Sequence, residues 1–162
     1  MQIVRFLRFL LPVIFTFLAA CSDSKPKEKL IYYKDSNAVL RRYFTIKDQI
    51  DGLMQEYYQD GKVKMERNFK NGIQTGPSIA YYPDGKHKER QYFVNGVQEG
   101  GDTLFYPDGK PQFIVQFKGG KKDGALQKWT EDGVLFFEAI YQMDSLKSVK
   151  SQNPNLKNVE NQ

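Results

Sequence analysis

The side chains of this sequence that could do chemistry are few and widely spaced. His87 is the only histidine, so a metal site of several imidazoles and a Ser-His-Asp relay both lack support in the sequence. Glu66, Glu89 and Glu138 could supply carboxylates for glycoside cleavage, but that reaction needs two carboxylates at a defined separation in a cleft. We therefore expect no catalytic residue, no metal and no cofactor, and we expect His87 to be an exposed strand residue.

Four aspartates recur at a spacing of 24 residues, each directly before a glycine: Asp60, Asp84, Asp108 and Asp132. Calcium takes six or more oxygen ligands around one ion. One carboxylate in every 24 residues does not converge on a single ion, so we interpret these aspartates as turn residues.

Other residues keep the same period, which indicates an internal repeat. The chain is rich in aromatic residues, with 10 Tyr and 12 Phe, and such side chains favour strands. A weaker unit precedes four regular ones. The repeated glycines are Gly52, Gly76, Gly100 and Gly124; the first aromatic column is Tyr57, Tyr81, Phe105 and Trp129; the second is Phe69, Phe93, Phe117 and Tyr141.

Each repeat carries two turn signals. Asp60-Gly61 and Asn71-Gly72 both favour a two-residue type I′ hairpin, because each pair can place positive φ at both central positions. Two strands and two such turns fill the 24 positions of a repeat. The sequence therefore predicts an all-β fold in which antiparallel β-hairpin repeats form an elongated, twisted single-sheet meander.

The turns also predict how the strands pair. Counted outward from a two-residue turn at Asp60-Gly61, Tyr57 faces Lys64 and Gly52 faces Phe69. The same count places every repeated glycine opposite a residue of the second aromatic column. We expect each ring to cover the bare backbone of the glycine that it faces, an arrangement called aromatic rescue.

The stretch "GPSIAYYPDGKHKERQYFVNGVQEG", residues 76–100, closely resembles the MORN-repeat variant of the YwqK-like antitoxin family. The units that begin at Gly52 and Gly76 match the family pattern almost completely. The next unit departs from it at Gly119, and the last departs at Val134 and at Met143-Asp144. The resemblance implies a binding or scaffolding module with protein or lipid-headgroup partners. An antitoxin would ordinarily work in the cytoplasm.

The first 20 residues have the pattern of a secretory signal. Arg5 and Arg8 precede an uncharged run, residues 9–20, that ends in small residues. This run is shorter than the roughly 20 apolar residues that span a bilayer as a helix. A buried helix of a globular domain is the alternative interpretation.

The tetrapeptide Leu18-Ala19-Ala20-Cys21 resembles the lipobox of bacterial lipoproteins. The resemblance implies that Cys21 receives a diacylglycerol, that the signal is removed before it, and that the new amino group is acylated, for example with palmitate. More than one acyl chain makes membrane attachment stable. Ser22 in place of Asp implies the outer membrane by analogy with sorting in enteric bacteria. Cys21 is the only cysteine, so no intrachain disulfide can form.

Removal of the signal leaves 22 basic and 19 acidic residues, a net charge near +3. That charge is too small to indicate a nucleic-acid partner. The charged residues are therefore interpreted as a solvated surface, with weak attraction to anionic lipid or polysaccharide as the alternative.

The aromatic columns are the remaining place for a binding function. If they lie on opposite faces of an isolated sheet, one row could be available to a partner, since contiguous exposed apolar area marks interaction sites. Rows of Tyr and Trp also stack on sugar rings, which makes a glycan the alternative ligand. The other interpretation is that both rows only hold neighbouring strands together.

We expect five segments along the chain: a signal peptide (residues 1–20), a lipidated cysteine with a flexible tether (21–29), a degenerate first repeat (30–51), four MORN-type repeats (52–144) and a polar tail (145–162). The stretch "SLKSVK" in the tail could instead cover the last strand edge. The predicted function is a membrane-anchored, non-enzymatic scaffold that contacts an unknown protein of the bacterial cell envelope. The alternatives are an antitoxin or immunity protein that neutralises a toxin, and an envelope glycan-binding protein.

Overall fold

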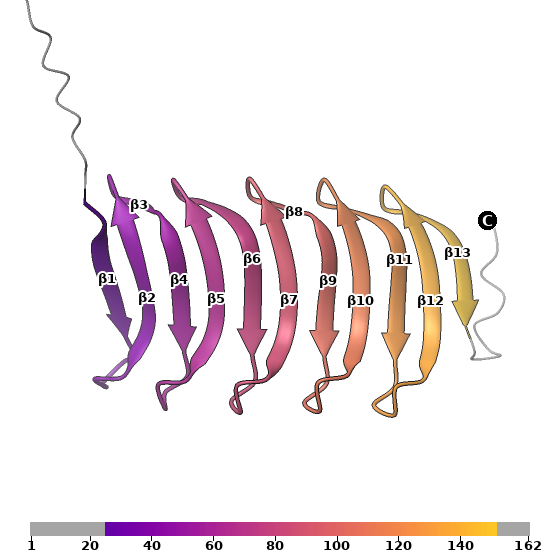
Figure 1. Ribbon diagram of the computed structural model, residues 1–162, viewed down its shortest axis with the longest axis horizontal. Coiled ribbons are helices and arrows are strands. Elements are labelled where there is room, and N and C mark those ends of the chain that lie inside the picture. The colour runs from indigo at the N-terminus through magenta and orange to yellow at the C-terminus, as the bar shows by residue number, and fades with distance from the viewer. Residues whose placement is uncertain (1–24, 152–162) are drawn as a thin grey trace, which may run out of the picture.

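The structure, a computed structural model, describes residues 25–151, which form one antiparallel sheet (Figure 1). The strands follow one another across the sheet in chain order, except that the two-residue strands β3 and β8 pair with β2 and β7. The predicted all-β meander of hairpins is confirmed. The strands are β1 (Lys27–Tyr32), β2 (Val39–Ile46), β3 (Gln49–Ile50), β4 (Gly52–Tyr57), β5 (Val63–Lys70), β6 (Ile73–Tyr81), β7 (His87–Val94), β8 (Val97–Gln98), β9 (Gly100–Phe105), β10 (Pro111–Lys118), β11 (Lys121–Trp129), β12 (Leu135–Gln142) and β13 (Ser145–Ser151).

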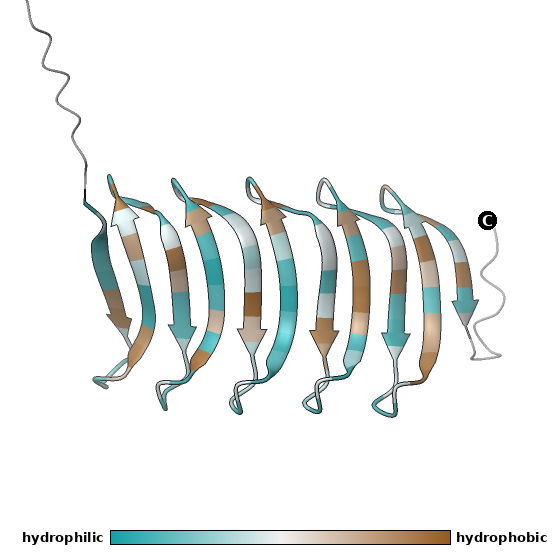
Figure 2. Cartoon of the chain, in the orientation of Figure 1, coloured by the Kyte–Doolittle hydropathy of each residue, from teal (hydrophilic) through white to brown (hydrophobic). Residues whose placement is uncertain are grey.

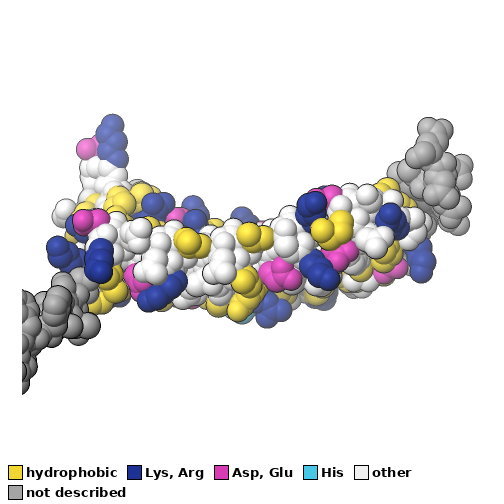
Figure 3. Space-filling model, turned by 90° about the horizontal axis from the view of Figure 1, so that it is seen from above, with side chains coloured by type: hydrophobic (Ala, Val, Ile, Leu, Met, Phe, Trp, Pro, Cys, Tyr) yellow, Lys and Arg dark blue, Asp and Glu magenta, His cyan; other side chains and the backbone are white. Residues whose placement is uncertain are grey.

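The sheet is a single layer. Seen from the edge that carries the Asn-Gly turns, the described residues form a long, narrow and curved body (Figure 3). Hydrophobic and hydrophilic segments alternate along most strands, although β7 is largely hydrophilic and β10 contains a long hydrophobic stretch (Figure 2). Residues 25–151 contain no helix with the length and apolar character needed to cross a membrane.

The Asn-Gly turns have the predicted geometry. Asn71 and Gly72 have φ values of 49° and 78°, which is the left-handed pair that a type I′ turn requires. Asn95-Gly96 and Gly119-Gly120 repeat this pair of positive φ values, and so does Met143-Asp144 without any glycine. The turn geometry therefore survives in the last repeat, where the sequence signal is lost.

The Asp-Gly loops differ from the prediction. Gly61 N–H donates to the Tyr58 carbonyl at 3.0 Å, and Tyr58 N–H donates to the Lys62 carbonyl at 2.8 Å. Of the three residues between Tyr58 and Lys62, Gly61 alone has a positive φ, 83°. This is a three-residue loop, a type I turn followed by a glycine bulge.

The extra loop residue changes the pairing beside the loop. Tyr57 lies opposite Val63, whereas the prediction placed it opposite Lys64. Beyond this point Glu56 pairs with Met65, so Lys64 is an unpaired bulge residue that restores the predicted register. Because the bulge compensates for the extra loop residue, the rest of the hairpin has the predicted pairing.

The pairing of glycine with aromatic residue is confirmed, but the backbone gives a more direct reason for the glycine. Gly52 pairs with Phe69 and Gly76 with Phe93. Gly76 has a φ of 77°, a conformation that side chains with a Cβ disfavour. A Cβ built at Gly52 would meet no atom within 4 Å. Glycine is therefore required here by its left-handed backbone rather than by a ring that occupies its side-chain position.

The two faces of the sheet are unequally buried. Strand alternation and the pairing registers place the first aromatic column on one face, here called the Tyr57 face, and the second column on the other, here called the Met54 face. Val115 and Ala139, only 2% and 1% exposed, lie on the Met54 face. Among residues 25–151, seven of the eight buried residues lie on this face: Thr45, Met54, Ser78, Ala80, Val115, Leu126 and Ala139.

Two predicted segment boundaries are wrong. Residues 27–29, assigned to the flexible tether, begin β1 and pair with β2. Residues 145–151, assigned to the polar tail, form β13 and cover the edge of β12. Alternation of apolar and polar residues is weak in both segments, so strand pairing rather than a strong local pattern orders them. Cys21 and the signal segment lie outside the described residues.

The left-handed backbone at Gly76 makes a testable prediction. Gly76→Ala should lower the free energy of unfolding by about 1 to 2 kcal/mol, because a Cβ is disfavoured at this φ. Gly76→Asn should cost less, since Asn tolerates this conformation. Urea denaturation measures both values.

Gly101→Ala is the matched control. Gly101 has no positive φ, and its Cβ would meet the Gln116 side chain at 3.4 Å, an ordinary contact distance. An equal loss of stability at Gly101 and Gly76 would contradict the backbone explanation.

Candidate functional site

The two aromatic columns lie on opposite faces of the sheet, and all eight rings are half-buried. Neither row is therefore a freely exposed platform. Each row packs along the sheet and also presents part of its ring surface to solvent. The structure brings the members of each column together as a row that crosses the hairpins.

A polar network ties the first two rings of the Tyr57 face together. The Tyr57 hydroxyl donates to the Gln55 side-chain oxygen at 2.8 Å, and the Gln55 amide donates to Glu66 at 2.9 Å. The Tyr81 hydroxyl donates to the other oxygen of Glu66 at 2.9 Å. Burial, followed by the hydrogen bond to Glu66 and its charge, raises the pKa of Tyr81 to about 12. Tyr81 therefore stays a neutral donor in this network.

His87 lies in the same row as an exposed residue at the start of β7, as expected from the sequence. Its ring centroid is 5.5 Å from that of Tyr81 and 6.3 Å from that of Phe105, with tilted ring planes. The imidazole thus bridges two members of the first aromatic column on the solvent side.

Shallow grooves open beside this row at the Asp-Gly loops. One groove of about 270 Å³ is lined by Leu30, Ala38, Val39, Arg42, Tyr57 and Gly61. A second, of about 310 Å³, is lined by Gly85, Lys86, His87, Phe105 and Gly109. Ala38, Val39, Tyr57 and Gly61 each have their counterpart 48 residues later, in Lys86, His87, Phe105 and Gly109. A groove at equivalent positions therefore recurs two repeats further along the sheet, but its lining residues are of different types.

A third hollow lies between the hairpins that contain Trp129 and Phe113. Its volume is about 310 Å³, and it combines rings with the polar ends of Gln112 and Lys128. The lining residues are Leu104, Tyr106, Gln112, Phe113, Lys128, Trp129 and Phe136.

Sequence reasoning missed the second tyrosine of each "YY" pair and its equivalent Tyr106, which follows Phe105. The Tyr82 hydroxyl donates to the backbone carbonyl of Phe105, in the next repeat, at 2.7 Å. The acceptor in every case is the backbone carbonyl of a residue of the first aromatic column. The other three bonds are Tyr33 to Tyr57, Tyr58 to Tyr81 and Tyr106 to Trp129, at 2.7, 2.7 and 2.8 Å. The 24-residue recurrence of this tyrosine was the signal that could have identified it.

The aspartate and lysine of the Asp-Gly loop also have structural roles. Asp84 accepts a hydrogen bond from the Lys86 backbone N–H at 3.0 Å, which holds the pKa of this carboxyl below its usual range. The Lys86 ammonium donates to the Pro107 carbonyl in the next loop at 2.7 Å. Lys62 and Lys110 repeat the contact with the carbonyls of Pro83 and Glu131. The aspartates are thus turn residues, as predicted.

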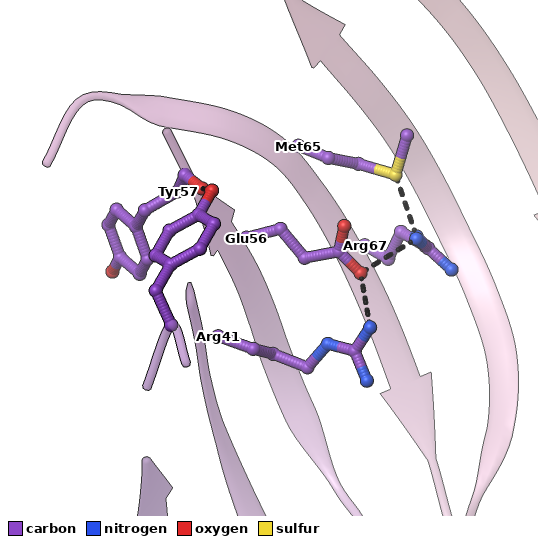
Figure 4. A network of polar contacts seen from close by, with 6 residues as sticks. Arg41, Glu56, Tyr57, Met65 and Arg67 are labelled. Atoms are coloured by element: carbon purple, nitrogen blue, oxygen red, sulfur yellow. Dashed lines mark hydrogen bonds and ion pairs between the residues drawn. The ribbon is translucent and has the colours of Figure 1, made fainter. Parts of the chain in front are cut away.

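The Met54 face carries an ionic network at its N-terminal end (Figure 4). The Glu56 carboxylate, only 15% exposed, accepts from Arg41 at 2.9 Å and from Arg67 at 3.1 Å. Arg67 Nε also contacts the Met65 sulfur at 2.9 Å. One carboxylate therefore bridges two guanidinium groups from β2 and β5.

Acidic residues occupy the middle of the same face. The Gln91 amide donates to Glu89 at 3.1 Å and to Asp102 at 2.9 Å. Burial, followed by the nearby Asp102 charge, raises the pKa of Glu89. Glu66 and Glu138 lie on the opposite face, in β5 and β12, so the three glutamates considered for glycoside cleavage do not come together. Within residues 25–151 no group of three or more His, Cys, Asp and Glu residues could hold a metal ion.

Comparison with protein families identifies the repeat. Residues 50–71 and 74–95 each match the family described as the MORN repeat variant. The matched segments include the hairpin signals Asp60-Gly61 and Asp84-Gly85, and the structure extends the same hairpin geometry to both sides of them. No curated protein matches the chain.

The tyrosine bonds between repeats predict the effect of removing one hydroxyl. Tyr82→Phe should lower the free energy of unfolding by about 1 kcal/mol, because the Phe105 carbonyl loses its donor while the ring is kept. Chemical denaturation measures this loss. Tyr92→Phe is the control, since the Tyr92 side chain is 48% exposed and the substitution should change stability little. Equal effects of the two substitutions would refute the role assigned to Tyr82.

The raised pKa of Glu89 predicts a dependence of stability on pH. The folded state binds this proton more tightly than the unfolded state, so stability falls as pH rises above the ordinary value of 4.5. Glu89→Gln keeps an oxygen acceptor for Gln91 and removes the charge. The variant should have a higher melting temperature than wild type at pH 7, and the difference should disappear well below pH 4.5.

Glu131→Gln, at an exposed loop position, is the control for a general charge effect. A melting temperature that Glu89→Gln leaves unchanged or lowers at pH 7 would contradict the predicted cost of ionising Glu89.

Proposed function

We propose that this chain is a non-catalytic protein-interaction module, anchored by lipid at Cys21 in the bacterial cell envelope. The two matched MORN-type repeats suggest an interaction module. The lipobox-like residues 18–21 support the anchor, and Ser22 favours the outer membrane. The sheet beginning at Lys27 would then stand close to the membrane, because the six residue steps from Cys21 extend at most about 20 Å.

The observation that carries the interaction role is the recurrence of one groove along the Tyr57 face. Tyr57 and Phe105 occupy equivalent positions in grooves 48 residues apart. A surface with half-buried aromatic residues at regular intervals suits an extended protein ligand that contacts several hairpins at once. The two grooves differ in chemistry, with Arg42 in one and His87 in the other. A ligand that contacts both grooves would therefore bind in one orientation along the sheet.

An antitoxin or immunity protein that neutralises a toxin would use the same type of surface. The two proposals differ in compartment. As an antitoxin, the chain would keep its unprocessed N-terminus and work in the cytoplasm. An envelope glycan is the alternative ligand, since the grooves place rings beside polar side chains. Processing at Cys21 and the identity of a crosslinked molecule therefore distinguish these functions.

The experiment that tests the proposal measures the intact mass of the protein recovered from membranes. We expect a chain that begins at an acylated Cys21, and we expect Cys21→Ala to lose both the added mass and the membrane association. An unmodified chain in the soluble fraction would refute the anchor and favour the antitoxin function.

Crosslinking of the same membrane fraction tests the binding surface. His87→Glu, on the Tyr57 face, should reduce a reproducible crosslink to an envelope protein several-fold, whereas Lys88→Glu is a neighbouring exposed control on a bulge of the same strand. Equal crosslinking by both variants would refute the groove as the contact site. Hydrolysis of an envelope substrate by the purified protein would refute the non-catalytic assignment.

A further inference from the structure

We propose that the outer edge of β1 pairs with β1 of a second copy of this chain, so that two sheets join across a two-fold axis. Among the described residues β1 pairs only with β2, and its other side is an open strand edge. Open edges are templates for pairing with another chain. This inference concerns a different surface from the grooves and does not rest on the lipid anchor.

The hydrogen-bond pattern identifies the groups available on this edge. Tyr33 N–H donates to the Ala38 carbonyl and so points toward β2. Backbone groups of an antiparallel strand alternate between its two neighbours. The N–H and C=O groups of Glu28, Leu30 and Tyr32 therefore point outward, where a further strand could bond to them.

The first half of β1, Lys27–Lys29, is charged, but its second half does little to protect the edge. Leu30, Ile31 and Tyr32 are consecutive, apolar or aromatic, and 41%, 39% and 50% exposed. Both edge strands carry two lysines, which oppose pairing. In β13 lysines and serines separate the apolar residues, as its sequence "SLKSVKS" shows, whereas Leu30–Tyr32 form an unbroken run in β1. The less protected edge is therefore β1, which favours a contact between two identical edges over a head-to-tail chain of sheets.

Symmetry restricts the register of such a contact. A two-fold axis perpendicular to the sheet pairs residues that lie on the same face. A centre at Glu28 or Lys29 would place identical charges directly opposite each other, which is destabilising. A centre at Leu30 pairs this residue with its own copy and Glu28 with the partner's Tyr32. This register uses all three outward-facing residues in hydrogen-bonded pairs.

The resulting dimer would be one continuous antiparallel sheet with the Tyr57 faces of both copies on the same side. Leu30 lines the first groove together with Arg42 and Tyr57. The two copies of that groove would then lie on either side of the axis. The dimer would present the repeated surface twice, in opposite directions along the joined sheet.

Disulfide crosslinking of the full chain in intact cells, whichever compartment holds it, tests the register. Leu30→Cys should form a disulfide-linked dimer on mild oxidation, because the Cα atoms of a hydrogen-bonded pair lie about 5.5 Å apart, within the range that a disulfide spans. Leu53→Cys is the matched control, since Leu53 is 38% exposed on the same face but in β4. The chain without an introduced cysteine reports any crosslinking through Cys21.

We expect a dimer several times more abundant for Leu30→Cys than for Leu53→Cys or for Ile31→Cys, whose partner in this register is Lys29. Equal dimer formation by the three variants would indicate random collision and overturn the proposal. Stronger linkage through Ile31→Cys would overturn the register.

A second measurement does not depend on disulfide geometry. Leu30→Lys places two lysines opposite each other and should halve the protein mass of the purified complex measured by light scattering. Leu53→Lys should leave that mass unchanged. A monomeric wild-type protein, or larger assemblies that persist in Leu30→Lys, would overturn the proposal.

Discussion

The hydroxyl of the second tyrosine in each "YY" pair, or of its equivalent Tyr106, donates to a backbone carbonyl of the next repeat, and this bond fixes how one hairpin lies against its neighbour. A single-layer sheet has no second layer to cover it, so each hairpin is held by the hairpins beside it. The loop lysines add a second bond in the same direction, as from Lys62 to the carbonyl of Pro83. The segment "YYPDGK" therefore has two roles. It reverses the chain, and its Tyr82 and Lys86 side chains bond to the next repeat.

The sequence allowed the fold and much of the register to be predicted, because Asn71-Gly72 and its equivalents state the turn type directly. It failed at Asp60-Gly61, since that dipeptide fits both a two-residue and a three-residue loop, and the bulge at Lys64 that decides between them has no sequence signature. The aromatic rows were identified, but their half-buried state and the grooves depend on the curvature of the sheet. Tyr58 and Tyr82 were visible as a column, yet an acceptor 23 residues away belongs to tertiary structure.

The Met54 face shows how a thin sheet combines burial with charge. Glu56 can remain ionised at 15% exposure because Arg41 and Arg67 both donate to it. In the middle of the face Glu89 and Asp102 have an amide donor, Gln91, in place of a cation. Toward the C-terminus Val115, Leu126 and Ala139 provide apolar burial. The repeats thus share a backbone but differ in what stabilises them, and these differences distinguish one register of the sheet from a slip by a whole repeat.

The last regular hairpin departs from the repeat at the positions that would bond to a following one. Thr130 stands where Tyr106 stands one repeat earlier, and its hydroxyl accepts from Val134 N–H at 3.1 Å within its own loop. Val134 itself replaces the lysine whose ammonium reaches the next loop. A tyrosine and a lysine here would have no carbonyl to bind among the described residues, because β13 is a single strand rather than another hairpin. The substitutions at Thr130 and Val134 therefore end the series of inter-repeat bonds where the last hairpin of the sheet ends.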